Sequence, residues 1–184
     1  MANITLHEGR PTDKRSAREN SAYDYLDKLH IKYRRADHPA ADTMEACEEV
    51  DKVLGVTMCK NLFLCNRQKT NFYLLLIPGD KPFKTKDLSA QLGVARLSFG
   101  SPEDMEELLG LSPGAVSVIG LINDLDGFVR LLIDEELMSA AEIGCHPLVN
   151  TSSIAFSTDD LLNILIPATK HKPTVVTLPR AVEE

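Results

Sequence analysis

A lysine within an apolar segment is the first feature of this sequence that suggests chemistry. Lys60 lies in residues 59–64, CKNLFL, which have the composition of a buried strand. A lysine ammonium is costly to bury without a partner. The Lys60 side chain therefore either reaches solvent, as its long stem allows, or serves a functional site.

A polar loop between two apolar segments is the second such feature. Residues 144–151, GCHPLVNT, place the imidazole of His146 and the carboxamide of Asn150 among turn-forming residues. These groups, with exposed backbone N–H groups, suit the stabilisation of a developing oxyanion. The alternative is a structural turn with a hydrogen-bonded histidine. The same two interpretations apply to His38, which comes shortly before a helix N-terminus at Thr43.

Other common sites are not indicated by the residue pattern. Cys145 and His146 are adjacent, and adjacent strand residues face opposite ways, which disfavours a Cys–His nucleophile. The spacing of Cys59 and Cys65 fits neither a zinc finger nor a ribbon, so we expect no metal. The sequence has no Gly-x-Ser-x-Gly elbow, phosphate-binding glycine loop or dinucleotide fingerprint, so we expect no cofactor.

Capping residues and apolar spacing predict the helices that would position these side chains. Ser16, Thr43 and Ser101 are suitable N-caps, and Gly55, Gly93 and Gly110 follow the expected ends of three helices. The predicted helices cover residues 17–30, 44–54, 85–92, 102–109 and 159–166.

β-prone segments bounded by turn residues predict the strands. The predicted strands cover residues 31–37, 58–66, 71–78, 94–99, 115–122, 127–133, 141–145 and 152–156. Because strands and helices do not alternate regularly, a single α+β domain with a mixed sheet fits better than a doubly wound fold. We expect a domain over 19–167, an N-terminal extension over 1–18 and a C-terminal tail over 168–184.

Composition and charge limit the function classes. The chain has 184 residues, 43% of them hydrophobic, and a net charge of −7, which argues against a protein that coats DNA or RNA electrostatically. Residues 52–96 nevertheless carry a local charge of +6, which could meet a few RNA phosphates or merely be solvated. No apolar run is long enough to span a membrane and no secretory signal is evident, so we expect a cytoplasmic protein without a membrane partner.

Five segments in the same order resemble one known family. They are His38-Pro39 before the Thr43-capped helix, and residues 59–64 (CKNLFL), 96–101 (RLSFGS), 111–117 (LSPGAVS) and 146–151 (HPLVNT). With them the chain resembles the YbaK-like and prolyl-tRNA-synthetase-associated editing domains, in particular the free-standing Ala-tRNA(Pro) deacylases. The resemblance runs from Ser21 to Ile166 and implies a mixed, mostly antiparallel, barrel-like sheet flanked by helices.

The resemblance also implies an activity and residue roles. The expected activity is trans-editing, the hydrolysis of the ester that joins a wrongly attached small amino acid, here alanine, to the terminal ribose of tRNA(Pro). The family is described as using the ribose 2′-hydroxyl and backbone groups rather than a protein nucleophile. The residues expected to be catalytic are Lys60 and His146, and those expected to bind substrate are His38, Thr43, Asn61, Ser117, Leu121, Gly144, Pro147 and Asn150. Gly144 and Pro147 depart from the family's Gly-x-x-x-Pro pattern because only two residues separate them.

Three alternatives remain open at this point. The chain could deacylate tRNA charged with cysteine or serine, it could be a non-catalytic module that binds tRNA or a synthetase, or it could bind a small molecule unrelated to tRNA. The expected ligand is the 3′ acceptor end of an aminoacylated tRNA. Prolyl-tRNA synthetase and an elongation factor are the candidate protein partners, a choice that the sequence leaves open.

Overall fold

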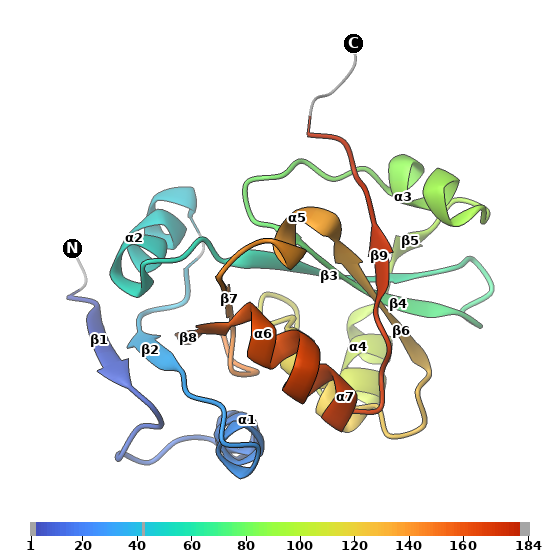
Figure 1. Cartoon of the computed structure of the whole chain (residues 1–184). Helices are drawn as coiled ribbons and strands as arrows, with labels where there is room; N and C mark the ends of the chain where they lie inside the picture. Colours follow the sequence, from blue (N-terminus) through green and yellow to red (C-terminus); the bar gives the residue numbers. More distant parts are fainter. Residues whose placement is uncertain (1–2, 42, 181–184) are drawn as a thin grey trace.

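Two β-sheets form the centre of the computed structural model, which describes residues 3–41 and 43–180 (Figure 1). The first sheet has the strand order β1-β2-β8-β7 and the second has the order β5-β3-β4-β6-β9. The first sheet consists of β1 (Thr5–Glu8), β2 (Arg34–Asp37), β8 (Ser152–Ser157) and β7 (Glu142–Cys145). The second consists of β5 (Ser98–Phe99), β3 (Cys59–Cys65), β4 (Phe72–Pro78), β6 (Val129–Asp134) and β9 (Thr174–Val176).

The pairing is mostly antiparallel. Among the strands of the described residues, only two pairs are parallel, β4 with β6 and β6 with β9. A parallel bridge between Met58 and Gly144 links the two sheets. The expected α+β domain with a mixed sheet is confirmed, with the strands divided between two linked sheets.

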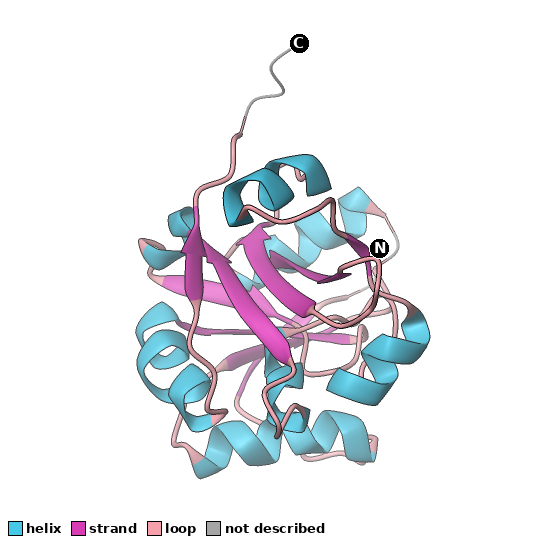
Figure 2. Cartoon of the chain, turned by 90° about the vertical axis from the view of Figure 1, so that its right-hand side faces the viewer, coloured by secondary structure: helices cyan, strands magenta, loops and turns pink. Residues whose placement is uncertain are grey.

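Strand β4 is apolar on nearly every residue because both of its faces are covered. Leu74 and Leu76 belong to the large core, whereas Tyr73, Leu75 and Ile77 belong to a second apolar cluster on the opposite face. This alternation is typical of a strand buried on both sides. Figure 2 shows helices on several sides of the strands.

The helices begin and end largely where their capping residues predict. They are α1 (Ala17–Lys28), α2 (Met44–Leu54), α3 (Thr85–Leu92), α4 (Pro102–Leu109), α5 (Glu135–Met138) and the continuous α6 (Thr158–Asp160), η2 (Leu161–Leu165) and α7 (Ile166–Ala168). The hydroxyls of Ser16, Thr43 and Ser101 accept hydrogen bonds from the first turns of α1, α2 and α4. Gly55 and Gly110 end α2 and α4 in the left-handed conformation. None of the described helices is long and apolar enough to cross a membrane.

The strand predicted over residues 115–122 is wrong. These residues include the start of η1 (Val118–Asn123), a 3-10 helix. Ser117 begins it by accepting a hydrogen bond from the Ile119 N–H group, and Gly120 packs so closely on Leu111 that a Cβ atom would lie 2.6 Å from Leu111 Cδ1. A short, fully buried apolar run has the same composition in a strand and in a helix, so periodicity does not separate them.

Both ends of the described chain contribute strands. Residues 5–8 of the expected N-terminal extension form β1, which pairs with β2. Residues 174–176 of the expected C-terminal tail form β9, which pairs with β6. Of the predicted strand over 94–99, only Ser98 and Phe99 are paired.

Candidate functional site

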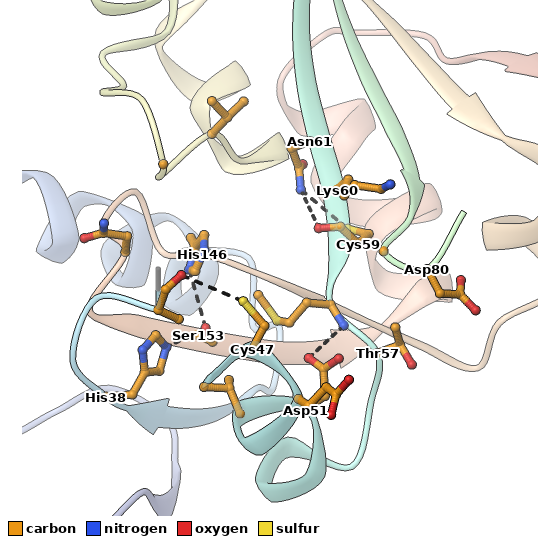
Figure 3. A pocket seen from close by; sticks show the side chains of 18 of the residues that line it. His38, Cys47, Asp51, Thr57, Cys59, Lys60, Asn61, Asp80, His146 and Ser153 are labelled. Atoms are coloured by element: carbon orange, nitrogen blue, oxygen red, sulfur yellow. Dashed lines mark hydrogen bonds between the residues drawn. The ribbon is translucent and has the colours of Figure 1, made fainter. Parts of the chain in front are cut away.

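A cavity of about 610 Å³ lies where the two sheets meet. Its walls come from the segment after β2, from α2, from β3, from the turn after β4, and from the loop that precedes β8. Figure 3 shows this cavity. The polar and charged residues that line it are His38, Thr43, Glu48, Asp51, Thr57, Lys60, Asn61, Asp80, His146, Asn150 and Ser153.

Six of the ten predicted site residues line this cavity, and four do not. Those that line it are His38, Thr43, Lys60, Asn61, His146 and Asn150. The other four are Ser117, Leu121, Gly144 and Pro147. Of these, Ser117 and Leu121 are fully buried at the start of η1, and Pro147 is buried in the loop after β7. Gly144 belongs to β7, where a Cβ atom would lie 2.7 Å from Met58 Sδ, so its position serves close packing between the sheets.

Lys60 extends from the start of β3, and its ammonium is held by a backbone group. The ammonium donates to the carbonyl oxygen of Lys81, in the turn after β4. Figure 3 shows the Lys60 side chain pointing away from His38 and His146. Because an ammonium has three donors, this contact leaves hydrogens for a ligand anion.

Asn61 fastens β3 to the start of η1. Its carboxamide oxygen accepts from the Val118 N–H group at 2.9 Å, and its amide nitrogen donates to the Cys59 carbonyl at 3.2 Å. The amide nitrogen also donates to Cys59 Sγ at 3.6 Å, and sulfur is a weak acceptor that a ligand oxygen can replace. Asn61 therefore shapes the cavity wall, and its amide can turn one donor to a ligand.

The side chains of His38 and His146 both contact the hydroxyl of Ser153. The ring nitrogen Nδ1 of His38 lies 2.8 Å from the Pro39 carbonyl and Nδ1 of His146 lies 2.9 Å from the Ser152 carbonyl, so each Nδ1 carries a proton. In neutral His38, Nε2 then accepts from the Ser153 hydroxyl at 2.8 Å. The Ser153 oxygen also lies 3.4 Å from Nδ1 of His146. Nε2 of His146 has no hydrogen bond to any described residue and is available to a ligand.

His146 is neutral near pH 7. Burial lowers the pKa of its imidazole below the ordinary value, the hydrogen bond to the Ser152 carbonyl opposes this, and His38 lowers the pKa further. A neutral imidazole with its proton on Nδ1 presents an acceptor at Nε2. His146 can therefore accept a hydrogen bond, or a proton, from a hydroxyl in the cavity.

The start of α2 and the loop before β8 supply further polar groups. The Thr43 hydroxyl accepts from the Ala46 N–H group at 3.2 Å, and the positive end of the helix dipole lies beside it. The Asn150 carboxamide makes no hydrogen bond to a described residue. It lies close to Gly114, since a Cβ atom added to that glycine would be 3.6 Å from Asn150 Nδ2. Asp42, which precedes Thr43, lies outside the described residues.

Sequence reasoning missed the carboxylates of the cavity. Glu48 and Asp51 on α2 and Asp80 after β4 line it together with Lys60, so the cavity presents both signs of charge. Burial raises the pKa of Asp51, against a hydrogen bond from the Met58 N–H group. The helical spacing of Cys47, Val50 and Leu54 predicts which face of α2 is turned toward the core. This spacing is the one signal in the sequence that could have indicated which α2 residues lie next to the cavity.

The buried cysteines are not suited to act as nucleophiles. Cys59 and Cys145 are buried, and burial raises the pKa of the Cys59 thiol to about 11 and that of Cys145 well above its ordinary value. A cysteine attacks as the thiolate, so both are unreactive near neutral pH. Cys145 does not line the cavity.

Comparisons with known proteins show what the chain is similar to. A sequence profile of the aminoacyl-tRNA editing domain matches residues 38–164. The chain is 31% identical over 140 residues to the prolyl-tRNA editing protein ProX of Acetoanaerobium sticklandii, and the alignment covers 76% of this chain and 85% of that protein. It is 29% identical over 168 residues to prolyl-tRNA synthetase associated domain-containing protein 1 of Danio rerio, and this alignment covers 90% of this chain and 88% of that protein.

The fold has a solved counterpart. A crystal structure of a candidate trans-editing enzyme for prolyl-tRNA synthetase superposes with a TM-score of 0.68 at 18% sequence identity, and covers 91% of this chain and 100% of that one. The chain belongs to the aminoacyl-tRNA editing domain family. Membership of this family implies hydrolysis of aminoacyl-tRNA.

Proposed function

We propose that this protein is a trans-editing deacylase that hydrolyses the ester of alanine on tRNA(Pro). The observation that carries the proposal is the cavity at the meeting of the two sheets, which brings together Lys60, Asn61 and His146. The names of the relatives, which refer to prolyl-tRNA editing and to prolyl-tRNA synthetase, support the choice of tRNA.

The charges of the cavity match those of an aminoacylated 3′ end. The terminal adenosine carries a phosphate, which suits the Lys60 ammonium, and the ester-linked amino acid carries an ammonium, which suits Asp51 or Glu48. Ionic groups of both signs hold such a substrate in one orientation. A bound ester held in one orientation needs less further activation, because positioning alone supplies a large share of a rate enhancement.

His146 has the properties of an acceptor for the ribose or for water. Its free Nε2 can accept from the 2′-hydroxyl of the terminal ribose or from the attacking water, and its lowered pKa keeps it neutral. The Asn61 and Asn150 carboxamides are the donors that could stabilise the oxyanion. In this scheme no protein atom forms a covalent bond to the substrate.

Size explains why a separate enzyme would be required. A synthetase site made for proline cannot strongly exclude smaller alanine, since each missing methylene changes binding by only about 1–3 kcal/mol. A second site that admits alanine and excludes proline removes the error. The partner of this chain is then the 3′ acceptor end of the tRNA, with prolyl-tRNA synthetase or an elongation factor as candidate protein partners.

The proposal is tested by release of labelled amino acid from charged tRNA. Purified protein and Lys60→Ala are compared on Ala-tRNA(Pro), with Pro-tRNA(Pro) and Cys-tRNA(Pro) as substrates of different size. We expect rapid alanine release by the wild type, a residual slow release in Lys60→Ala and no release of proline. Faster release of cysteine than of alanine would assign the site to Cys-tRNA(Pro), and release of none of the three would contradict the deacylase assignment.

A further inference from the structure

A buried ion pair lies outside the cavity but next to it in the fold. The side chains of Lys81 and Asp134 are 1% and 0% exposed, and Lys81 Nζ lies 2.8 Å from Asp134 Oδ2. Asp134 also accepts from the backbone N–H groups of Glu136 at 3.0 Å and Leu178 at 3.3 Å. A buried ion pair is costly unless its remaining hydrogen-bonding groups are satisfied, and here they are, so the pair favours a single arrangement.

The same lysine supplies the carbonyl that holds Lys60. The Lys81 N–H group donates to the Pro78 carbonyl at 3.0 Å, which closes a turn directly after β4. The Lys81 carbonyl accepts from the Lys60 ammonium. The side chain of Lys81 thus anchors the turn in the core of the second sheet, while its backbone fixes the ammonium of the candidate catalytic lysine.

The C-terminal segment closes over this ion pair. Strand β9 pairs with β6 up to Asp134, and the chain continues to Arg180, which forms an ion pair with Glu136. Glu136 in turn lies 3.2 Å from Lys81 Nζ. Figure 1 shows β9 running beside β6. Residues 174–180 therefore shield the Lys81–Asp134 pair from solvent.

We infer that Lys81 is a positioning residue for Lys60. Its buried ion pair with Asp134, covered by residues 174–180, sets the carbonyl that orients the Lys60 ammonium toward the substrate. The inference rests on the proposed function for its effect on catalysis. The position of the Lys60 side chain itself is a property of the free protein and can be measured without substrate.

The test compares Lys81→Met with Lys84→Met. Methionine keeps the length of the side chain and removes the charge, and Lys84 is an exposed lysine three residues further on. We expect Lys81→Met to lower the single-turnover rate of alanine release between about 10- and 100-fold, as misplacement of a reacting group does, and Lys84→Met to retain the rate. If Lys81 acts only through Lys60, its substitution has no further effect once Lys60 is removed. The double variant Lys60→Ala/Lys81→Met should therefore be no slower than Lys60→Ala alone.

A second variant and a second measurement keep the inference testable if Lys81→Met does not fold. Glu136→Gln is an isosteric change at a partly exposed residue that contacts Lys81 Nζ. We expect it to give a smaller rate loss that disappears in the Lys60→Ala background. The resonance of the Lys60 side chain, in protein with ¹³C-labelled lysine and assigned by its absence from Lys60→Ala, should shift in Lys81→Met or Glu136→Gln but not in Lys84→Met.

Two results would overturn the inference. One is an unmoved Lys60 resonance in the folded variants, which would show that the ion pair does not orient Lys60 whether or not the protein is a deacylase. The other is a double variant slower than Lys60→Ala by the full factor of the Lys81 change. A wild-type protein that releases no amino acid, with a Lys60 resonance that still depends on Lys81, would contradict the proposed function and leave the positioning role supported.

Discussion

The hydroxyl of Ser153 decides which ring nitrogens of the two cavity histidines are free. It occupies Nε2 of His38 at 2.8 Å, while both Nδ1 atoms face carbonyl oxygens. The ring nitrogen left for a ligand, among these two side chains, is Nε2 of His146. His38 therefore supports the site from within the protein, and His146 is the histidine that can meet the substrate.

The lowered pKa of His146 predicts how the rate depends on pH. The free Nε2 is an acceptor only when the ring is neutral, so the catalysed rate should be level near pH 7 and fall as the pH drops through the His146 pKa. The midpoint should lie below the ordinary value of about 6.5, because burial lowers this pKa. The measurement is the single-turnover rate of alanine release against pH, after subtraction of uncatalysed ester hydrolysis.

His146→Asn is the control for this pH dependence. Asparagine does not titrate, so the variant should be slower and should lack the acid decline. An acid decline of the same midpoint in the variant would assign the titration to another group.

Removal of the Ser153 hydroxyl should destabilise the protein. In Ser153→Ala, Nε2 of His38 loses its donor inside the protein, and leaving a buried polar group without a partner costs about 1–3 kcal/mol. Urea unfolding of the variant measures this loss. Ser139→Ala, at an exposed serine, is the matched control and should change the free energy of unfolding by less than about 0.5 kcal/mol.

Residue type was enough to single out two residues that line the cavity. Lys60 and His146 were noticed because a lysine inside an apolar run and a histidine in a polar loop are unusual, and the family resemblance then supplied their expected catalytic roles. Ser153 and Asp51 carry no such signal, since a serine in a strand and an acid on a helix are common on ordinary surfaces. Their roles follow from β8 and α2 coming together across the cavity, which no local pattern encodes.

At the scale of elements, the beginning of α2 is the segment that the candidate site depends on most directly. Thr43 lines the cavity and also caps the helix, and Glu48 and Asp51 follow within the next two turns. The placement of these carboxylates therefore depends on where the helix starts.

Thr43→Ala should destabilise the protein by about 1 kcal/mol, because the Ala46 N–H group loses its side-chain acceptor. Thr43→Ser keeps the hydroxyl and should retain most of the stability. Thermal or urea unfolding of both variants distinguishes the loss of the capping hydrogen bond from the effect of a smaller side chain. Equal losses in the two variants would contradict a capping role.

Elements with explicit start and stop residues were predicted well, and elements without them were not. Helices α2, α3 and α4 end at glycines and match their predicted ranges. Residues 115–122 contain a start residue, Ser117, but no glycine that ends the helix, and their apolar run also fits a strand. The close approach of Gly120 to Leu111 is a long-range contact that the pattern does not reveal. Strand β9 was missed because three residues are too few to show periodicity, and its pairing with β6 is a long-range contact.

At the scale of the whole molecule, ionic contacts attach the N-terminal segment to the first sheet. Arg15 contacts Glu19 on α1 at 2.9 Å and Asp37 on β2 at 2.9 Å, and Arg35 also binds Asp37. Burial by itself would raise the pKa of Asp37, but hydrogen bonds from Arg15, Arg35 and Ser152 hold this pKa well below its ordinary range. Asp37 therefore stabilises the folded protein in its ionised form.

Asp37→Asn should lower the free energy of unfolding by about 1–3 kcal/mol at pH 7. A carboxyl whose pKa is lowered by folding contributes stability that is present above its unfolded pKa of about 3.9 and is lost as the pH falls. The difference in free energy of unfolding between wild type and variant should thus stay level from pH 7 to about pH 5 and narrow as the pH falls through about 4. Urea unfolding at a series of pH values measures this difference. Asp13→Asn, at an exposed acid that contacts the same arginine, is the control and should lose much less stability than Asp37→Asn.

The overall class of the fold was predictable, but its division into two sheets was not. The irregular order of strands and helices indicated an α+β domain with a mixed sheet. Which strands share a sheet depends on pairs distant in sequence, such as β2 with β8 and β4 with β6. The cavity lies between the sheets, so the location of the site could be inferred only once these pairs were known.

The bridge between Met58 and Gly144 has an evolutionary consequence. Gly144 does not line the cavity, yet a Cβ atom there would lie 2.7 Å from Met58 Sδ and 3.2 Å from Val56 Cγ1, so the side chain of Met58, which lines the cavity, would have to shift. The size of amino acid that such a cavity admits can therefore drift through buried substitutions that the substrate never touches. Two descendants with identical cavity residues need not reject the same amino acids.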